Sequence, residues 1–195
     1  MHRTYLKSLL DDYHPLNQEE QNFKSEMLSF LSAHPDCFER SLEKGHFTAS
    51  AWLLNPDGSK ALLMHHAKLG QWFQLGGHCD GNPDVLAVAL KEALEESGLD
   101  RIKPVYSGIF DLDIHLIPEN PKDQAHYHYD VRFILQSETE TVKINRESKQ
   151  LLWIDSNPLS LPTNNFSIVR MFHKWLEMRK KNTNICKTEF DKKKF

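Results

Sequence analysis

The pattern of apolar positions predicts that the chain begins with two helices. Apolar side chains recur every three or four positions, the spacing of one helix face. They fall into two groups: Tyr5, Leu6, Leu9, Leu10 and Tyr13, then Phe23, Met27, Phe30 and Leu31. His14-Pro15 ends the first segment, because a residue before proline disfavours the helix, and Asn17 with Glu20 forms a capping-box pattern before the second. We expect residues 1–44 to form a helical extension that packs on the main domain.

From residue 46 the apolar pattern changes to that of short strands. Apolar runs at 47–54 and 61–64 flank a turn-rich segment at 55–59, which predicts a hairpin. A third short strand is expected at 71–75, directly before Gly76-Gly77. These segments predict the first part of a sheet.

Two later segments, 110–117 and 126–135, alternate between apolar and polar residues, which is the period of a strand. Their polar positions are Asp111, Asp113, His115, His126, His128, Asp130 and Arg132. If the two strands pair, the polar faces meet and line a cleft, where Arg132 would offer a bidentate contact to a phosphate. A solvent-facing sheet surface shows the same alternation, and that alternative stays open.

The end of the chain reads as a strand, a helix and a tail. A last short strand is expected at 151–154, and an amphipathic helix follows it, with apolar positions Phe166, Val169, Phe172, Trp175 and Leu176. Beyond Arg179 the sequence is polar and Lys-rich, and we expect a flexible tail. The predicted organisation is a mixed α/β protein: an extension at 1–44, one domain at 45–180 and a tail at 181–195.

The helix after the glycine pair has recognisable ends. Asn82 is expected to cap it, with Pro83 at the first helical position and Asp84 near the positive end of the helix dipole. Gly98 is expected to end the helix in the left-handed conformation.

The same helix carries three carboxylates on one face, because Glu92, Glu95 and Glu96 are spaced at i, i+3 and i+4. Each like-charge pair costs about 0.2–0.5 kcal/mol, and acids near a helix C-terminus cost about 0.3–1 kcal/mol each. A bound divalent cation would reverse the sign of this effect, and clustered carboxylates suit Mg²⁺ or Mn²⁺. The alternative is an exposed acidic face screened by water.

Composition excludes several classes of protein. Lys plus Arg is 24 and Asp plus Glu is 27, so the net charge of −3 argues against binding nucleic acid by bulk charge. No apolar run reaches the roughly 18 residues of a membrane span. The first residues show no secretory signal and the three cysteines are scattered, so we expect a reducing cytoplasm. Histidine is frequent: seven of the eleven lie between His46 and His128.

Residues 77–99 resemble the Nudix box, G-x5-E-x7-R-E-U-x-E-E-x-G-U, where U is a bulky aliphatic residue. The matching positions are Gly77, Glu92, Glu95, Glu96, Gly98 and Leu99. Three positions depart from the box: Pro83 stands at its first Glu, Lys91 at its Arg, and Ala93 at an aliphatic position. The resemblance covers about residues 46–175 and implies an α/β/α sandwich with a mixed sheet. The N-terminal helical extension predicted from the apolar spacing precedes this sandwich.

The Nudix resemblance implies a metal-dependent hydrolase that cleaves the pyrophosphate bond of a nucleoside diphosphate linked to another moiety. Mg²⁺ or Mn²⁺ would be bound by Glu92, Glu95 and Glu96, with help from the carbonyl of Gly76. Glu147, six residues before Trp153, resembles in its placement a further glutamate that completes the metal site or acts as base in this family. The implied catalytic residues are Glu92, Glu95 and Glu147, and an ordinary loop acid is the alternative for Glu147.

The histidines suggest a second site for a metal or the substrate, with five candidates: His46, His78, His115, His126 and His128. Imidazole suits Zn²⁺ or Mn²⁺, although a single histidine is more often a hydrogen-bonded structural residue. The segment from His46 to His78 also resembles isopentenyl-diphosphate isomerase, a Nudix-fold enzyme with histidines in a second metal site. The catalytic cysteine of that isomerase corresponds here to Gly77, and Cys79 lies on the other side of His78.

Three functions therefore stay open. They are a Nudix hydrolase of a small nucleotide or diphosphate, an isomerase-like enzyme with a histidine metal site, and a nucleotide-binding module with little catalysis, which Pro83 and Lys91 would explain. The sequence does not fix the oligomeric state, and a homodimer is one option.

Overall fold

The computed structural model describes residues 2–121 and 124–191, with side chains described as far as 181. The chain divides into two compact units, residues 1–155 and 156–195. The boundary between them falls inside the domain expected at 45–180. Residues 1–44, expected as a helical extension packed on the domain, belong to the same unit as the sheet.

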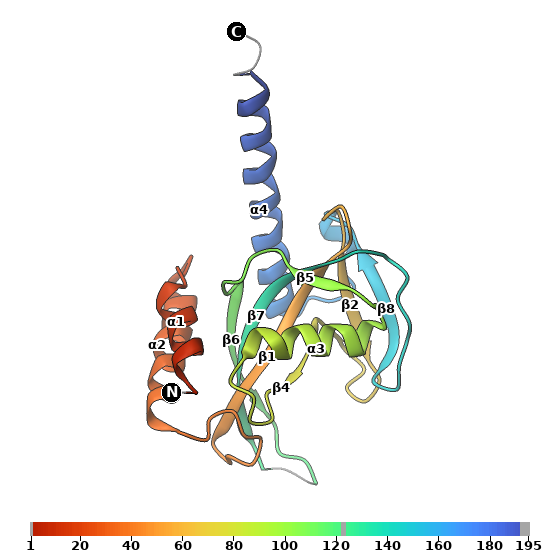
Figure 1. Cartoon of the computed structure of the whole chain (residues 1–195). Coiled ribbons are helices and arrows are strands. Elements are labelled where there is room, and N and C mark those ends of the chain that lie inside the picture. Colours follow the sequence, from red (N-terminus) through yellow and green to blue (C-terminus); the bar gives the residue numbers. More distant parts are fainter. Residues whose placement is uncertain (1, 122–123, 192–195) are drawn as a thin grey trace. The chain divides into compact units, whose positions relative to one another are not determined.

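The chain begins with the two predicted helices, α1 (Thr4–Asp12) and α2 (Gln18–Ala33), which lie side by side (Figure 1). Asn17 is the N-cap of α2, as the pattern predicted, since its side chain accepts a hydrogen bond from the Glu20 N–H. The Glu20 side chain accepts its backbone hydrogen bond from Leu16, one residue before the N-cap. The Phe30 ring of α2 stacks on Tyr129 of the sheet with 4.0 Å between centroids. The helices therefore pack on the main domain, as expected.

A mixed sheet of eight strands forms the centre of the first unit. The strands are β1 (Gly45–Leu54), β2 (Ala61–His66), β3 (Trp72–Phe73), β4 (Leu75–His78), β5 (Ile102–Pro104), β6 (Asp111–Ile117), β7 (His126–Ser137) and β8 (Ser148–Ile154). β1 pairs in parallel with β7 along its whole length, and antiparallel with β4 and β2. β6 and β5 pair with β7, and β8 and β3 pair with β2.

The predicted hairpin is confirmed by the pairing of Leu53 with Leu62. The strand expected at 71–75 is instead two short strands on different neighbours, since β3 pairs with β2 and β4 pairs with β1. β5 was not predicted, because its three residues show no alternation long enough to recognise.

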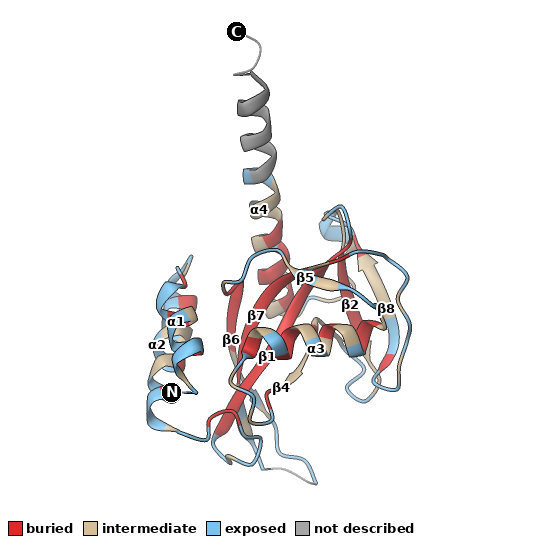
Figure 2. Ribbon diagram, viewed as in Figure 1, coloured by how far each residue is buried: buried red, intermediate tan, exposed pale blue. Residues whose placement is uncertain are grey.

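One helix, α3 (Val85–Ser97), covers the face of β1 that carries Phe47 and Ala49 (Figure 1). Its apolar residues Val88, Ala89 and Ala93 join the same buried cluster. β1 is buried along its whole length and β7 from Tyr129 to Leu135 (Figure 2). By strand alternation, His46 and Thr48 point to the opposite face of β1. This face carries the polar residues discussed below.

The predicted start of α3 is wrong by two residues. Asp84, not Asn82, is the N-cap: its side chain accepts a hydrogen bond from the Ala87 N–H. Asn82 instead accepts a hydrogen bond from the Asp84 N–H, so Pro83 lies before the helix. The predicted end is confirmed, because Gly98 has a φ of 66°.

The second unit contains a short 3₁₀ turn, η1 (Pro158–Ser160), and the predicted amphipathic helix, α4 (Phe166–Asp191). Its buried positions include Ile168, Met171, Phe172 and Trp175. The tail expected to be flexible from residue 181 is helical as far as Asp191, and residues 192–195 lie outside the described part. None of the described helices has the length and apolarity needed to cross a membrane.

Candidate active site

The glycine pair of β4 brings the sheet backbone into contact with the glutamates of α3. The Gly76 N–H donates a hydrogen bond of 2.8 Å to Oε2 of Glu96. A Cβ placed on Gly77 would lie 2.7 Å from the Cδ and Oε2 atoms of Glu92. A Cβ on Gly76 would lie 2.3 Å from the Cβ of Ser50 on β1. Gly77 therefore leaves space for the Glu92 carboxylate, and Gly76 allows β4 to lie close to β1.

The three glutamates predicted to share a face differ in burial. Glu96 is 4% exposed, whereas the side chains of Glu92 and Glu95 are 15% and 59% exposed. Burial, the largest effect, and the negative charges of Glu92, Glu147 and Glu95 together raise the pKa of Glu96 to about 8, against the lowering effect of the Gly76 N–H. The ionised form of Glu96 is therefore disfavoured in this group of carboxylates.

Lys91 occupies the position where the box has arginine. Its Nζ lies 3.1 Å from Oε1 of Glu92 and 3.5 Å from Oε2 of Glu95. The Lys91 side chain is exposed, so solvent screens both contacts. Lysine keeps the positive charge at this position but holds the two carboxylates without the planar fork of arginine.

Glu147 lies in the loop before β8, close enough to act electrostatically on Glu96. Its carbonyl accepts a hydrogen bond of 2.7 Å from the Ala67 N–H, and its N–H donates to Oδ1 of Asn145. Asn145 also donates a hydrogen bond of 3.1 Å from Nδ2 to the carbonyl of Glu95. The loop is thus attached to α3, and Glu147 belongs to the same acidic group as the box glutamates. Its chemical role stays a prediction.

All five histidines singled out in the sequence converge on one face of the sheet. The β1–β7 register places His46 beside His128, and the β6–β7 register places His115 beside His128. The centroid of the His46 ring lies 5.0, 4.8 and 5.0 Å from the rings of His78, His128 and His126, and the His115 ring lies 5.5 Å from that of His128. Alternation in β6 and β7 predicted part of this group, and the parallel β1–β7 pairing adds His46.

The centre of this histidine group is buried and poor in hydrogen bonds. His46 is 2% exposed, and neither of its ring nitrogens has a hydrogen-bond partner within the described structure; the same holds for Nε2 of His128. Burial, together with the neighbouring imidazoles, lowers the pKa of His46 to about 4 and that of His128 to about 2, so both rings are neutral at pH 7. A buried polar atom left without a partner costs about 1–3 kcal/mol.

The two outer histidines are held in place by neighbours. Nδ1 of His115 lies 2.9 Å from Oδ2 of Asp113, and Nδ1 of His126 lies 2.8 Å from the carbonyl of Gln124. Such contacts orient an imidazole ring and fix which nitrogen points away. These two rings therefore flank the buried centre in defined orientations.

The structure does not place Arg132 as predicted. Its side chain is 2% exposed, and its guanidinium group contacts three carboxylates: Asp130 at 2.7 Å, and Asp111 and Asp113 at 3.1 Å each. The polar faces of β6 and β7 do meet, as expected, but around this ion-pair network rather than around a phosphate. Both strands carry acidic and basic residues on this face, but the sequence alone could not show which of them would pair.

Cys79, considered for the isomerase-like alternative, does not join the histidines. It belongs to the apolar core on the other face of the sheet, as alternation from His78 requires, and burial raises the pKa of its thiol. With Gly77 at the position of the isomerase cysteine, neither candidate position supplies a reactive thiol to this face.

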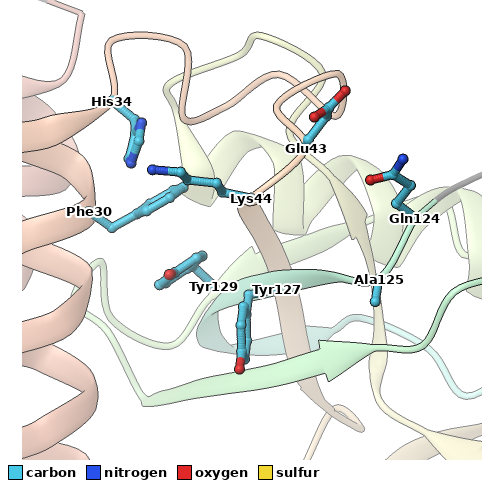
Figure 3. A pocket seen from close by; sticks show the side chains of 8 residues that line it. All are labelled: Phe30, His34, Glu43, Lys44, Gln124, Ala125, Tyr127 and Tyr129. Carbon is cyan, nitrogen blue, oxygen red and sulfur yellow. The ribbon is translucent and has the colours of Figure 1, made fainter.

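The structure also has a hollow of about 570 Å³, whose lining side chains are drawn in Figure 3. It is lined by Phe30, His34, Glu43, Lys44, Gln124, Ala125, Tyr127 and Tyr129. Tyr127 and Tyr129 alternate with His128 along β7, so their side chains point to the opposite face of the sheet. None of the box glutamates of α3 and none of the five converging histidines lines this hollow.

Comparison with known proteins agrees with this geometry. The chain matches the NUDIX domain over residues 44–176, about two thirds of its length. It therefore belongs to the Nudix family, with the Nudix α/β/α fold, and is a hydrolase that acts on phosphorus-containing acid anhydrides. No curated protein matches it in sequence.

Several solved structures share this fold at low sequence identity. A MutT protein from Methanosarcina mazei Go1 is 18% identical, with a TM-score of 0.52 over 72% of this chain and 99% of that one. A MutT NUDIX hydrolase from Burkholderia pseudomallei is 16% identical, with a TM-score of 0.52 over 68% and 98%. An Ap4A hydrolase from C. elegans, in a binary complex, is 12% identical, with a TM-score of 0.51 over 69% and 98%.

Proposed function

We propose that this hydrolase cleaves the pyrophosphate bond of a nucleoside diphosphate linked to another moiety, and that it uses Mg²⁺ or Mn²⁺ bound at the glutamate face of α3. The observation that carries the proposal is Glu96, a buried carboxylate with three further carboxylates close enough to raise its pKa. A diphosphate is itself an anion, so an acidic site can accept it only with cations between the two.

The residues present fit a hard divalent cation. The carboxylates of Glu92, Glu95 and Glu96 offer oxygen atoms from one helix face, and Glu147 offers another from the loop before β8. The carbonyl of Gly76 would complete the set, because the N–H of the same residue already contacts Glu96. Mg²⁺ and Mn²⁺ both prefer such oxygen ligands.

When bound, the cation would polarise the diphosphate and lower the pKa of a coordinated water molecule. The protein supplies position and proton transfer. Glu92 is held against Gly77, and Lys91 supports Glu92 and Glu95 from the solvent side. Glu147, which is exposed on its loop, is the residue we propose as a base that takes a proton from the attacking water. The products are a nucleoside phosphate and the phosphorylated partner.

The proposal also includes the cellular location, the kind of substrate and the oligomeric state. A reducing cytoplasm stays a prediction from the sequence. The substrate is a small molecule rather than a membrane or bulk nucleic acid. The C. elegans structure, an Ap4A hydrolase, supports including dinucleoside polyphosphates among the substrates to test. A homodimer stays a prediction.

A substrate panel tests the proposal. The panel contains nucleotide sugars, dinucleoside polyphosphates, ADP-ribose, NADH and nucleoside triphosphates, each with Mg²⁺ or Mn²⁺, and the readout is the phosphorylated products. We expect hydrolysis of at least one diphosphate that depends on the added metal. Glu92→Gln and Glu96→Gln should each lower kcat by about 10²-fold or more while the circular dichroism spectrum stays unchanged.

The matched control is Glu138→Gln, because Glu138 is an exposed glutamate paired with Arg101 away from the box. Its turnover should equal that of the wild type. Hydrolysis that persists in both box variants would refute the assignment of these residues. Tight nucleotide binding without any metal-dependent hydrolysis across the panel would instead favour a binding module.

A further inference from the structure

We propose that His46, His78 and His128 form a second metal site, for a transition-metal dication of the Zn²⁺ type, distinct from the glutamate site. One ring nitrogen from each of these three residues can be chosen so that all lie within 4.8 Å of one another. The residues come from three different strands, β1, β4 and β7, which the hydrogen-bonded sheet fixes side by side. Nitrogen ligands favour Zn²⁺ and similar cations over Mg²⁺.

The buried nitrogens of the group provide a second, independent observation. His46 is 2% exposed, and both its ring nitrogens lack a hydrogen-bond partner among the residues described; Nε2 of His128 is in the same position. Most buried polar atoms in proteins are hydrogen-bonded, and an unpaired one calls for an explanation such as an ion. The atoms without partners are the atoms that a metal would use.

The distances suit a cation after a small adjustment. Two nitrogens bound to one tetrahedral Zn²⁺ lie about 3.4 Å apart, since each Zn–N bond is about 2.1 Å. The chosen nitrogens are now up to 4.8 Å apart. Small rotations of the rings that move each nitrogen by about 1 Å would bring them to the distance that Zn²⁺ requires. Three protein ligands then leave a fourth position for water or for an oxygen atom of a bound molecule, the arrangement found in catalytic rather than structural zinc sites.

His126 and His115 pack next to the three proposed ligands. The His126 ring is stacked 5.0 Å from His46, and the His115 ring lies 5.5 Å from His128. Both are oriented through Nδ1, His115 by Asp113 and His126 by the carbonyl of Gln124. Carboxylate and carbonyl contacts of this kind fix imidazole rings around metal sites.

The site is separated from the glutamates by the backbone of β4. His78 points to the polar face of the sheet, whereas Gly77, the residue before it, contacts Glu92 on the side of α3. The two sites also differ in chemistry, since one offers nitrogen atoms and the other oxygen atoms. Each can therefore be emptied without removing a ligand of the other.

Calorimetric titration of the full-length protein with zinc chloride tests the inference, in the presence of excess Mg²⁺ to occupy the carboxylates. We expect the wild type to bind about one Zn²⁺ per chain. His78→Ala and His128→Gln should each lose this stoichiometric binding. His65→Ala is the matched control, because His65 is also a half-buried strand histidine but lies outside the group, and it should bind Zn²⁺ like the wild type.

Thermal unfolding separates loss of the site from loss of the fold. Zn²⁺ should raise the Tm of the wild type and of His65→Ala, and leave the Tm of His78→Ala unchanged. The double variant Glu92→Gln/Glu96→Gln should still bind Zn²⁺. The zinc titration therefore tests the histidine site even if the protein has no hydrolase activity. The inference is overturned if the wild type binds no stoichiometric Zn²⁺, or if His78→Ala and His128→Gln, both folded, bind it as tightly as the wild type.

Discussion

At the scale of one residue, Glu96 is the group on which the proposed cation site depends most. Its carboxylate is almost fully buried, and one backbone N–H, that of Gly76, donates to it. Burial and nearby glutamates raise its pKa from 4.5 to about 8. A residue with this pKa is costly when ionised, and a divalent cation is the ligand that would remove the cost.

The raised pKa of Glu96 predicts a pH-dependent stability in metal-free buffer. Below pH 4.5 the carboxyl is protonated in both the folded and the unfolded state. Between about pH 4.5 and 8 the unfolded state releases the proton first, so the contribution of Glu96 to stability is lost as pH rises. Relative to Glu96→Gln, which mimics the protonated form, the wild type should lose on the order of a few kcal/mol over this range.

Urea unfolding of both proteins at several pH values, with EDTA present, measures this difference. The comparison with Glu96→Gln is needed because the depressed pKa values of His46 and His128 act in the opposite direction: both histidines favour the folded state at high pH. A wild-type and variant pair whose difference in stability is the same at pH 5 and pH 8 would contradict the account of Glu96.

Arg132 gives a second prediction at this scale, because its charge is needed by three buried carboxylates. Arg132→Met should destabilise the protein by about 3–5 kcal/mol, since it leaves buried charges without a partner. Denaturant unfolding measures the effect. Arg101→Met is the control, as Arg101 forms an exposed pair with Glu138 and should change stability by less than about 1 kcal/mol. A stable Arg132→Met protein with a raised KM would restore the phosphate-binding role.

These residues also show which parts of the site could be predicted from the sequence. Helical spacing was enough to put Glu92, Glu95 and Glu96 on one face, and strand alternation was enough to put His126 and His128 on another. The direction of Arg132 was not predictable, because the sequence does not show whether a charged strand residue points to a ligand or to a neighbouring carboxylate. Burial decides this, and burial depends on the packing of the whole sheet.

The contact of β4 with α3 is the arrangement that matters at the scale of elements. The two glycines of β4 differ in what a side chain would meet. A Cβ on Gly76 would lie 2.3 Å from the Cβ and 2.6 Å from the Cα of Ser50, and 2.8 Å from the carbonyl oxygen of Ala49. A Cβ on Gly77 would instead meet the end of the Glu92 side chain at 2.7 Å, and that end can rotate away.

Alanine at the two positions should therefore have different effects. Gly76→Ala pushes strand backbones apart and should destabilise the protein by about 1–3 kcal/mol. Gly77→Ala should change stability little but displace Glu92, and we expect kcat to fall about tenfold or more. Denaturant unfolding and steady-state kinetics on the two variants separate the effects. The account of the contact is wrong if Gly77→Ala keeps full kcat.

Elements were more predictable than their connections. The two N-terminal helices, the hairpin and the end of α3 at Gly98 follow from apolar spacing, turn residues and capping. The start of α3 was missed because Asn82 and Asp84 are both good N-cap residues, and the hydrogen bond from the Asp84 N–H to Asn82 decides between them. The parallel pairing of β1 with β7 could not be predicted, because about 80 residues separate the paired positions.

At the scale of the sheet-containing unit, residues 1–155, the central sheet separates three features. The histidines lie on one face, the aromatic hollow lies on the other, and the glutamates of α3 contact the backbone of β4. The family resemblance pointed to the glutamates from a short motif. It could not supply the meeting of the histidines, which depends on strands far apart in the sequence. The unit thus contains two chemically different groups of side chains, carboxylates and imidazoles, and the proposed hydrolysis depends on the carboxylates.

Binding of Mn²⁺ at the box glutamates, followed by electron paramagnetic resonance, tests that account most directly. Only the signal that Mg²⁺ displaces is counted, since Mg²⁺ competes for oxygen ligands and poorly for imidazole. We predict that the wild type binds Mn²⁺ in this displaceable form and that Glu92→Gln/Glu96→Gln, folded by circular dichroism, does not. Equal displaceable binding by the two proteins would contradict the claim that these carboxylates hold the cation.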